Sequence, residues 1–256
     1  MRINPALLSV LILNLAAIVA APGSLGGYDS WLSVIGAAGS LLTLLYIVLA
    51  LRRSYKDGIP GPISWIWLAV AVVFEAAALS YQLYLDIQWV MPFYPTAGDI
   101  LWILSYIPLG VVFLLAIRRF PAATGSIRIS QNSRLQLSLI WTAAIAALLL
   151  MVMWILNMLS LTPFGERLML TATFLLNLFL LLSVIFAVKA AGRRLSLHTP
   201  FLWVVVGALL LSIADASFLF TSNSNLFNPA LDFLWLLAFS TWIWGASLFG
   251  RQEPLA

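Results

Sequence analysis

The chain contains no cysteine and a single histidine, and these two scarcities exclude several kinds of site. Without cysteine there are no disulfide bonds, thiolate metal sites or thiol nucleophiles. One chain cannot supply the two axial histidine ligands of a b-type haem, because His198 stands alone. Both lysines, Lys56 and Lys189, lie near the ends of apolar stretches, so a retinal Schiff base at mid-membrane is excluded as well.

Charge is also scarce, since charged residues make up 9% of the chain and hydrophobic residues 63%. A soluble domain of this length needs far more charge on its surface. A hydrocarbon core about 30 Å thick requires roughly 20 apolar helical residues to cross it. Eight stretches meet that length, at residues 5–22, 31–51, 62–85, 98–117, 136–160, 168–190, 200–221 and 231–249. We therefore predict an all-α polytopic membrane protein with eight transmembrane helices and no soluble domain.

The basic residues predict the orientation in the membrane. Twelve of the 13 lysines and arginines fall at the termini or in the three loops after the second, fourth and sixth stretches, and Arg167 is the exception. The positive-inside rule makes that side cytoplasmic, with both termini inside. We expect a multi-pass protein of the cell (inner) membrane. The net charge of +4 is then explained by basic loops at the membrane surface, and no nucleic-acid partner is expected.

Several landmarks occur twice in the same order, which predicts an internal repeat. Each half has an apolar stretch opened by Pro-x-x-Trp that carries an acid, followed by a polar corner with a second acid and a tryptophan. Four helices return the chain to its starting side, so the two units are parallel and related by a pseudo-two-fold axis along the membrane normal. We place the first unit at residues 1–120, a cytoplasmic linker at 121–133 and the second unit at 134–251.

The two polar corners organise the candidate site. In residues 95–106 Asp99 is followed three residues later by Trp102, and in residues 228–239 Asp232 is followed at the same spacing by Trp235. A structural role is the stronger reading for both acids, because an acid in the first helical turn is stabilised by the helix dipole and by capping. A ligand-binding role at the outer face remains the alternative.

Glu75 and Asp215 are different, because neither lies at a helix end. At a rise of 1.5 Å per residue both are roughly 20 Å from the helix start, in the outer half of the membrane. A charge at such depth is costly, so these acids should face the interior and are candidates for a functional site. Hydrogen bonding across a helix interface is the competing reading. It is also the preferred reading for the amides in apolar stretches, Asn14, Asn157 and Asn177.

Tyr81 and Gln82 lie near the outer end of the third stretch. With Trp89, Phe93 and Tyr94 they would form the mouth of an outer-facing cleft, although an interfacial aromatic belt explains the same composition. The candidate ligand-binding residues are therefore Glu75, Asp99, Asp215, Asp232, Tyr81, Gln82, Trp102 and Trp235. No catalytic or metal-ligating set is identified, and the sequence specifies no cofactor.

The run from Pro92 to Pro108, PFYPTAGDILWILSYIP, resembles a motif of the form P-S-x-A-D-x-x-Y-L-x-x-Y-P. That motif belongs to the multi-helix membrane sensor regions that precede diguanylate cyclase, phosphodiesterase or histidine kinase domains in bacteria. Here Trp102 replaces a tyrosine, Gly98 is additional and Pro108 is displaced by one position. Asp215 and the corner from Asp232 to Trp235 are similar to the second half of the same regions. The resemblance implies a signal-input module, which we expect to act without an output domain on the same chain.

We therefore expect a non-enzymatic membrane sensory or binding module. It would take a small apolar ligand, a lipid or a partner helix in an outer-leaflet cleft between the two units, and would contact membrane lipids and a cytoplasmic signalling protein. Two alternatives remain open: an accessory subunit of a larger membrane complex, and a proton-coupled transporter, which buried acids at a repeat interface would fit. An intramembrane hydrolase using paired carboxylates is the least supported, since no nucleophile or oxyanion motif accompanies them.

Overall fold

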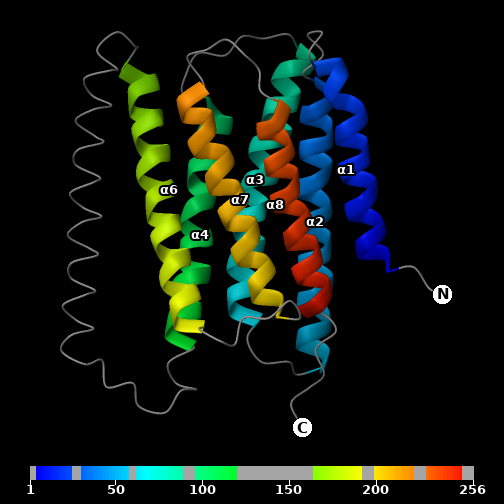
Figure 1. Ribbon diagram of the computed structural model, residues 1–256, viewed down its shortest axis with the longest axis vertical. Helices are drawn as coiled ribbons and strands as arrows, with labels where there is room; N and C mark the ends of the chain where they lie inside the picture. The colour runs from blue at the N-terminus through cyan, green and yellow to red at the C-terminus, as the bar shows by residue number, and fades with distance from the viewer. Residues whose placement is uncertain are drawn as a thin grey trace.

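The computed structural model describes residues 4–24, 30–57, 62–88, 96–119, 164–191, 199–221 and 229–249. Every element in these ranges is an α-helix, as predicted (Figure 1). The helices are α1 (Pro5–Ser24), α2 (Ser30–Asp57), α3 (Pro62–Gln88), α4 (Ala97–Arg119), α6 (Phe164–Ala191), α7 (Pro200–Thr221) and α8 (Pro229–Phe249). The predicted helix at residues 136–160 lies outside the described ranges.

Proline marks the first position of four of these helices, α1, α3, α7 and α8. Proline suits this position because the helix leaves its N–H unpaired there anyway and because its fixed φ matches the helical value. At α1 the side chain of Asn4 completes the start, since its Oδ1 accepts a hydrogen bond from the Ala6 N–H at 3.2 Å. These local signals explain why the predicted starts of α1, α3 and α7 agree with the structure.

The described helices form a closed ring with one helix outside it. Going around the ring, α2 contacts α3, α3 contacts α4, α4 contacts α6, α6 contacts α7, α7 contacts α8, and α8 returns to α2. Helix α1 packs against α2 and α8 from outside, at the right of Figure 1. The pairs α2–α8 and α4–α6 each run in the same direction, whereas the other neighbours in the ring are antiparallel (Figure 1).

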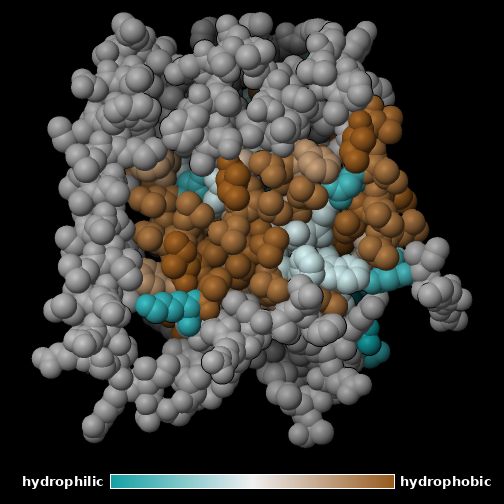
Figure 2. Space-filling model, viewed as in Figure 1, coloured by the Kyte–Doolittle hydropathy of each residue, from teal (hydrophilic) through white to brown (hydrophobic). Residues whose placement is uncertain are grey.

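Among the helices that the structure describes, four contain a stretch long and apolar enough to cross a membrane: Ser33–Lys56, Ile63–Gln88, Ala97–Ile117 and Thr171–Lys189. Shorter apolar stretches occupy α1, α7 and α8. Many large hydrophobic side chains face outward, for example Val19 with 78% of its surface exposed. Figure 2 shows the described side chains on one face of the bundle as mostly apolar. An apolar exterior of this kind is typical of a protein surrounded by lipid, so the chain is an integral membrane protein.

The interior of the ring is filled by large side chains, including Trp242, Phe113 and Phe239, which are almost completely buried. Trp65 of α3 stacks on Phe249 of α8, with ring centroids 4.8 Å apart. Glycine permits the closest helix contacts: a Cβ at Gly110 would overlap the Phe179 ring of α6, and one at Gly207 would overlap Trp242 of α8. Small residues are the usual means by which helices approach closely in membranes.

Candidate functional site

Glu75 lies near the middle of α3 and has 4% of its surface exposed. Its Oε1 accepts a hydrogen bond from the Ser105 hydroxyl of α4 at 2.5 Å. The same hydroxyl oxygen is 2.7 Å from the backbone oxygen of Trp102. One hydroxyl proton thus serves two acceptor oxygens. The carboxyl group of α3 is therefore held directly against the helix that carries the first polar corner.

Asp215 lies in the last third of α7 and is completely buried. Its Oδ2 accepts a hydrogen bond from the Tyr106 hydroxyl of α4. Its Oδ1 accepts one from the Trp235 indole N–H of α8 at 2.7 Å. Three helices therefore meet at one carboxyl group, and each of its oxygens faces a donor. Buried carboxyl groups need such donors because they have lost water as a hydrogen-bonding partner.

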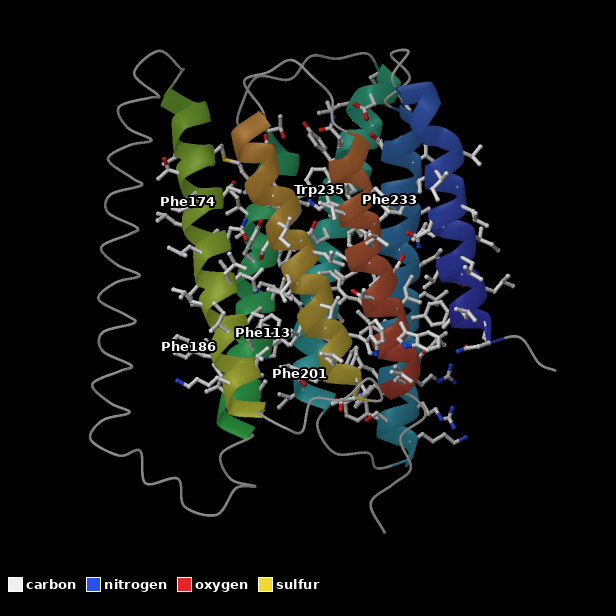
Figure 3. The ribbon with its side chains drawn as sticks, in the orientation of Figure 1. Phe113, Phe174, Phe186, Phe201, Phe233 and Trp235 are labelled. Carbon is white, nitrogen blue, oxygen red and sulfur yellow. The ribbon has the colours of Figure 1, made fainter. Side chains whose placement is uncertain are left out.

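The Trp102 ring packs against both residues that donate hydrogen bonds to Asp215. It lies edge-to-face against Tyr106 and also against Trp235, with centroid separations of 6.3 Å in both pairs. Edge-to-face contacts of this kind fix the orientation of the rings as well as burying them. Figure 3 labels Trp235 in the upper half of α8, well above Phe113 and Phe201.

We call the six residues that meet here the acid–aromatic cluster: Glu75, Trp102, Ser105, Tyr106, Asp215 and Trp235. Ser105 and Tyr106 are consecutive residues of α4, so their hydrogen bonds to Glu75 and Asp215 bring α3 and α7 to the same level of that helix. The cluster thus brings together four residues that the sequence analysis selected from distant parts of the chain, Glu75, Trp102, Asp215 and Trp235. It occupies the centre of the ring, between helices of both predicted units.

Asp99 has a clear local role at the start of α4. Its Oδ2 accepts hydrogen bonds from the Thr96 backbone N–H at 2.8 Å and from the Thr96 hydroxyl at 2.7 Å. In return, the Thr96 hydroxyl oxygen accepts the Asp99 N–H at 3.1 Å. This reciprocal arrangement is a capping box in which aspartate takes the usual place of glutamate. The carboxylate that was a candidate for ligand binding therefore stabilises its own helix.

Thr96→Ala removes the cap hydroxyl and is expected to destabilise the protein by about 1 kcal/mol, the usual effect of losing a threonine cap. Thr96→Ser keeps the hydroxyl and should remain close to wild type. Thermal unfolding of the two purified variants in the same detergent measures the difference. Equal stability of Thr96→Ala and Thr96→Ser would contradict the capping role.

Tyr81 and Gln82 lie near the upper end of α3, outside the acid–aromatic cluster. Tyr81 is half-buried and covers Gly98, where a Cβ would lie 3.1 Å from its ring. Gln82 is exposed and donates to Oδ1 of Asp86 at 2.9 Å, and Ser33 of α2 donates to the other oxygen at 2.6 Å. Gln82 thus belongs to a polar contact between α2 and α3. Trp89, Phe93, Tyr94 and the side chain of Asp232 lie outside the described part of the structure.

Sequence reasoning did not select Ser105 and Tyr106 as site residues, although both follow the tryptophan of the first corner. They lie three and four residues after Trp102, so they share its helix face, and that spacing was the available signal. The interhelical reading of two amides is confirmed. Asn14 donates to the Ser240 hydroxyl at 2.8 Å, and Asn177 donates to the Ser212 backbone oxygen at 2.9 Å.

The cluster brings together polar groups that can form hydrogen bonds and exchange protons. It offers two carboxyl groups, two hydroxyls and an indole N–H, all buried between helices. Among the described residues, no group of three or more His, Asp or Glu side chains is arranged to hold a metal ion. Comparison of the chain with protein-family models, with curated proteins and with solved structures finds no match.

Proposed function

We propose that the protein is a non-enzymatic membrane sensory or binding module whose input site is the acid–aromatic cluster. The observation that carries this proposal is the network of Tyr106, Asp215 and Trp235, which joins α4 to α7 and α8 at the centre of the ring. A ligand that alters one of these contacts alters the packing of α4 or α8 against α7. This is the property that a signal-input module needs.

The proposed architecture is eight transmembrane helices in two parallel units of four, at residues 1–120 and 134–251. Exchanging α2 with α6, α3 with α7 and α4 with α8 maps the ring of contacts onto itself. The two contacts within the ring that join different units, α2–α8 and α4–α6, then become equivalent. This exchange is what a two-fold axis along the membrane normal would produce, and it supports the repeat.

We further propose that both termini are cytoplasmic, in a cell (inner) membrane. The exposed side chains of Arg52, Arg53 and Lys56 lie at the end of α2, and that of Lys189 lies at the end of α6. Both helix ends are at the lower end of the bundle in Figure 1. Basic groups gathered at one end support this orientation through the positive-inside rule. The same groups would present a docking surface to a cytoplasmic signalling protein.

The ligand would be a small apolar molecule, a lipid or a partner helix that reaches the cluster from the outer half of the bundle. Trp102 and Tyr81 are half-buried and offer aromatic surface on that side. Such a ligand would gain apolar burial from the rings and specificity from the buried carboxyl groups, the usual division of roles in small-molecule sites. The resemblance of the first corner to bacterial sensor regions favours the same role.

Thermal unfolding of the purified protein across a panel of lipids and small apolar compounds tests this proposal. A compound at 100 times its dissociation constant should stabilise the wild type by about 2.7 kcal/mol. Glu75→Gln and Asp215→Asn should reduce that stabilisation, because both remove a charge or a proton-exchanging group from the cluster. Ser247→Ala is the control, since Ser247 donates within its own helix to Trp244 at 2.8 Å. The proposal fails if no compound stabilises the wild type.

An accessory role in a larger membrane complex is the second candidate, and helix α1 favours it. This helix packs on α2 and α8 from outside the ring, and its other side exposes a series of apolar side chains, including Leu11, Leu15 and Val19. A partner helix would find a continuous apolar surface there. Gentle solubilisation followed by native electrophoresis should then show a band much larger than one chain, whereas a monomer-sized band would exclude a stable complex.

A further inference from the structure

The contact between α6 and α7 contains polar atoms whose hydrogen-bonding capacity is unused. Asn177 of α6 and Ser212 of α7 have 3% and 1% of their surfaces exposed. The Asn177 amide nitrogen donates to the backbone oxygen of Ser212 at 2.9 Å, so the two residues are direct neighbours. The Asn177 Oδ1 and the Ser212 Oγ are both buried and have no hydrogen-bond partner among the described residues.

Two unpartnered oxygen atoms at one helix contact are unexpected in a protein interior. Buried polar atoms almost always have a partner, because leaving one unpaired costs the full desolvation of that atom. A buried hydroxyl elsewhere on α6, that of Ser183, shows the usual solution, since it donates to the Phe179 backbone oxygen at 2.8 Å. The Asn177 and Ser212 oxygens are therefore arranged to receive a small bound species.

Asp215 lies three residues after Ser212, so the two side chains share one face of α7. Both Asp215 oxygens already accept hydrogen bonds, from Tyr106 and from Trp235. Donors to both oxygens are the arrangement that an ionised carboxylate prefers. The basic side chains that the structure describes lie at the C-terminal ends of α2 and α6, at the lower end of the bundle (Figure 1): Arg52, Arg53, Lys56 and Lys189. Asp215, in contrast, lies in the last third of α7, which runs upward in the same view.

We propose that a sodium ion binds between α6 and α7, with the Asn177 Oδ1, the Ser212 Oγ and the Asp215 carboxylate as its oxygen ligands. Hard cations prefer ligands of this kind, namely carboxylate, amide and hydroxyl oxygens. A single carboxylate balances one positive charge, which favours a monovalent ion over calcium or magnesium. The ion would supply a partner for the two buried oxygens and a counter-charge for Asp215 at the same time.

This site lies beside the acid–aromatic cluster and shares Asp215 with it. Occupancy by sodium would therefore balance the negative charge of the carboxylate to which Tyr106 and Trp235 donate. The ion site goes beyond the sensory role proposed above, because its binding is measured directly and does not require an organic ligand. A protein that binds sodium and no compound of the ligand panel would retain this site and lose the sensory proposal.

Equilibrium binding of radioactive sodium to the purified full-length protein in detergent tests the proposal, with choline chloride keeping the ionic strength constant. We expect about one ion per chain in the wild type, and competition by unlabelled sodium that is stronger than competition by potassium. Ser212→Ala should weaken binding by at least about tenfold, the loss that even mutations behind the ligands cause at metal sites. Asp215→Asn should remove it.

Ser183→Ala is the matched control, because it removes a buried serine hydroxyl that donates to the Phe179 backbone oxygen of its own helix. It should bind sodium as the wild type does. Ser212→Ala removes one oxygen atom and is the deciding variant if Asp215→Asn does not fold. The proposal is overturned if the wild type binds no sodium, if potassium competes as well as sodium, or if Ser212→Ala and Ser183→Ala bind it equally. If the wild type binds no sodium, water alone is the partner of the Asn177 and Ser212 oxygens.

Discussion

Replacing Gly207 with alanine is expected to destabilise the protein by about 1–3 kcal/mol, the usual cost of inserting a methyl group into a fully packed interior. The added Cβ would overlap the indole of Trp242 and would lie 2.6 Å from the Thr241 hydroxyl. Trp242 cannot move away cheaply, because it is completely buried and its Nε1 donates to the Val204 backbone oxygen at 3.2 Å. The contact between α7 and α8 must therefore open, or that hydrogen bond must break.

Gly36→Ala is the matched control. It makes the same chemical change inside a helix, α2, but its Cβ would meet Leu79 at 3.8 Å, which is ordinary contact. This variant should gain up to about 1 kcal/mol from the better helix propensity of alanine. Denaturation of both variants by the same detergent titration measures the difference. If Gly207→Ala proves as stable as Gly36→Ala, the helices α7 and α8 do not pack as closely as described.

The Tyr106–Asp215 contact is expected to show strong energetic coupling. Tyr106→Phe removes one donor from a carboxyl group that is shielded from water, and this should cost about 1–3 kcal/mol. In an Asp215→Leu background the same change should cost much less, because no carboxyl oxygen is then left unpaired. A double-mutant cycle of the four proteins should give a coupling energy of roughly 0.5–3 kcal/mol, the range for residues in one buried network.

Tyr46→Phe provides the comparison for this cycle. The Tyr46 hydroxyl lies 3.1 Å from the Ser9 hydroxyl at the outer contact of α1 with α2, where it is only partly buried. Its loss should cost less than that of Tyr106, since the remaining serine can find another partner. Additive effects of Tyr106→Phe and Asp215→Leu would show that the bond contributes nothing to the link between α4 and α7.

The same network explains how Asp215 can affect several helices at once. A carboxyl group bonded from two other helices holds those helices in one relative arrangement. Any event that changes its charge or its partners, whether a ligand, a proton or the proposed sodium ion, would act on α4, α7 and α8 together. Polar groups are costly in a membrane interior, so those retained at a helix junction are candidates for function as well as for packing.

Local chemistry alone determined much of this protein. The low charge and long apolar runs determined that it is helical and embedded in a membrane, because only a helix satisfies its backbone within one segment. Prolines set several helix starts, and the Thr96–Asp99 pair set another. The ends were less predictable. Helix α2 continues from the predicted limit at residue 51 to Asp57, since a helix extends beyond its apolar part where water satisfies its last carbonyl groups.

Only the tertiary structure decided which helices meet and which side chains share a site. Helices that are apolar on nearly every side carry no strong periodic signal for the face that points inward. The sequence therefore identified Glu75 and Asp215 as unusual. It could not show that Ser105 donates a hydrogen bond to Glu75 and that Tyr106 donates one to Asp215. Nor could it show that Gly207 lies in a tight contact between helices whereas Gly36 has room for a methyl group. Those distinctions depend on the rotation and spacing of neighbouring helices, which the packing of large side chains across the ring determines.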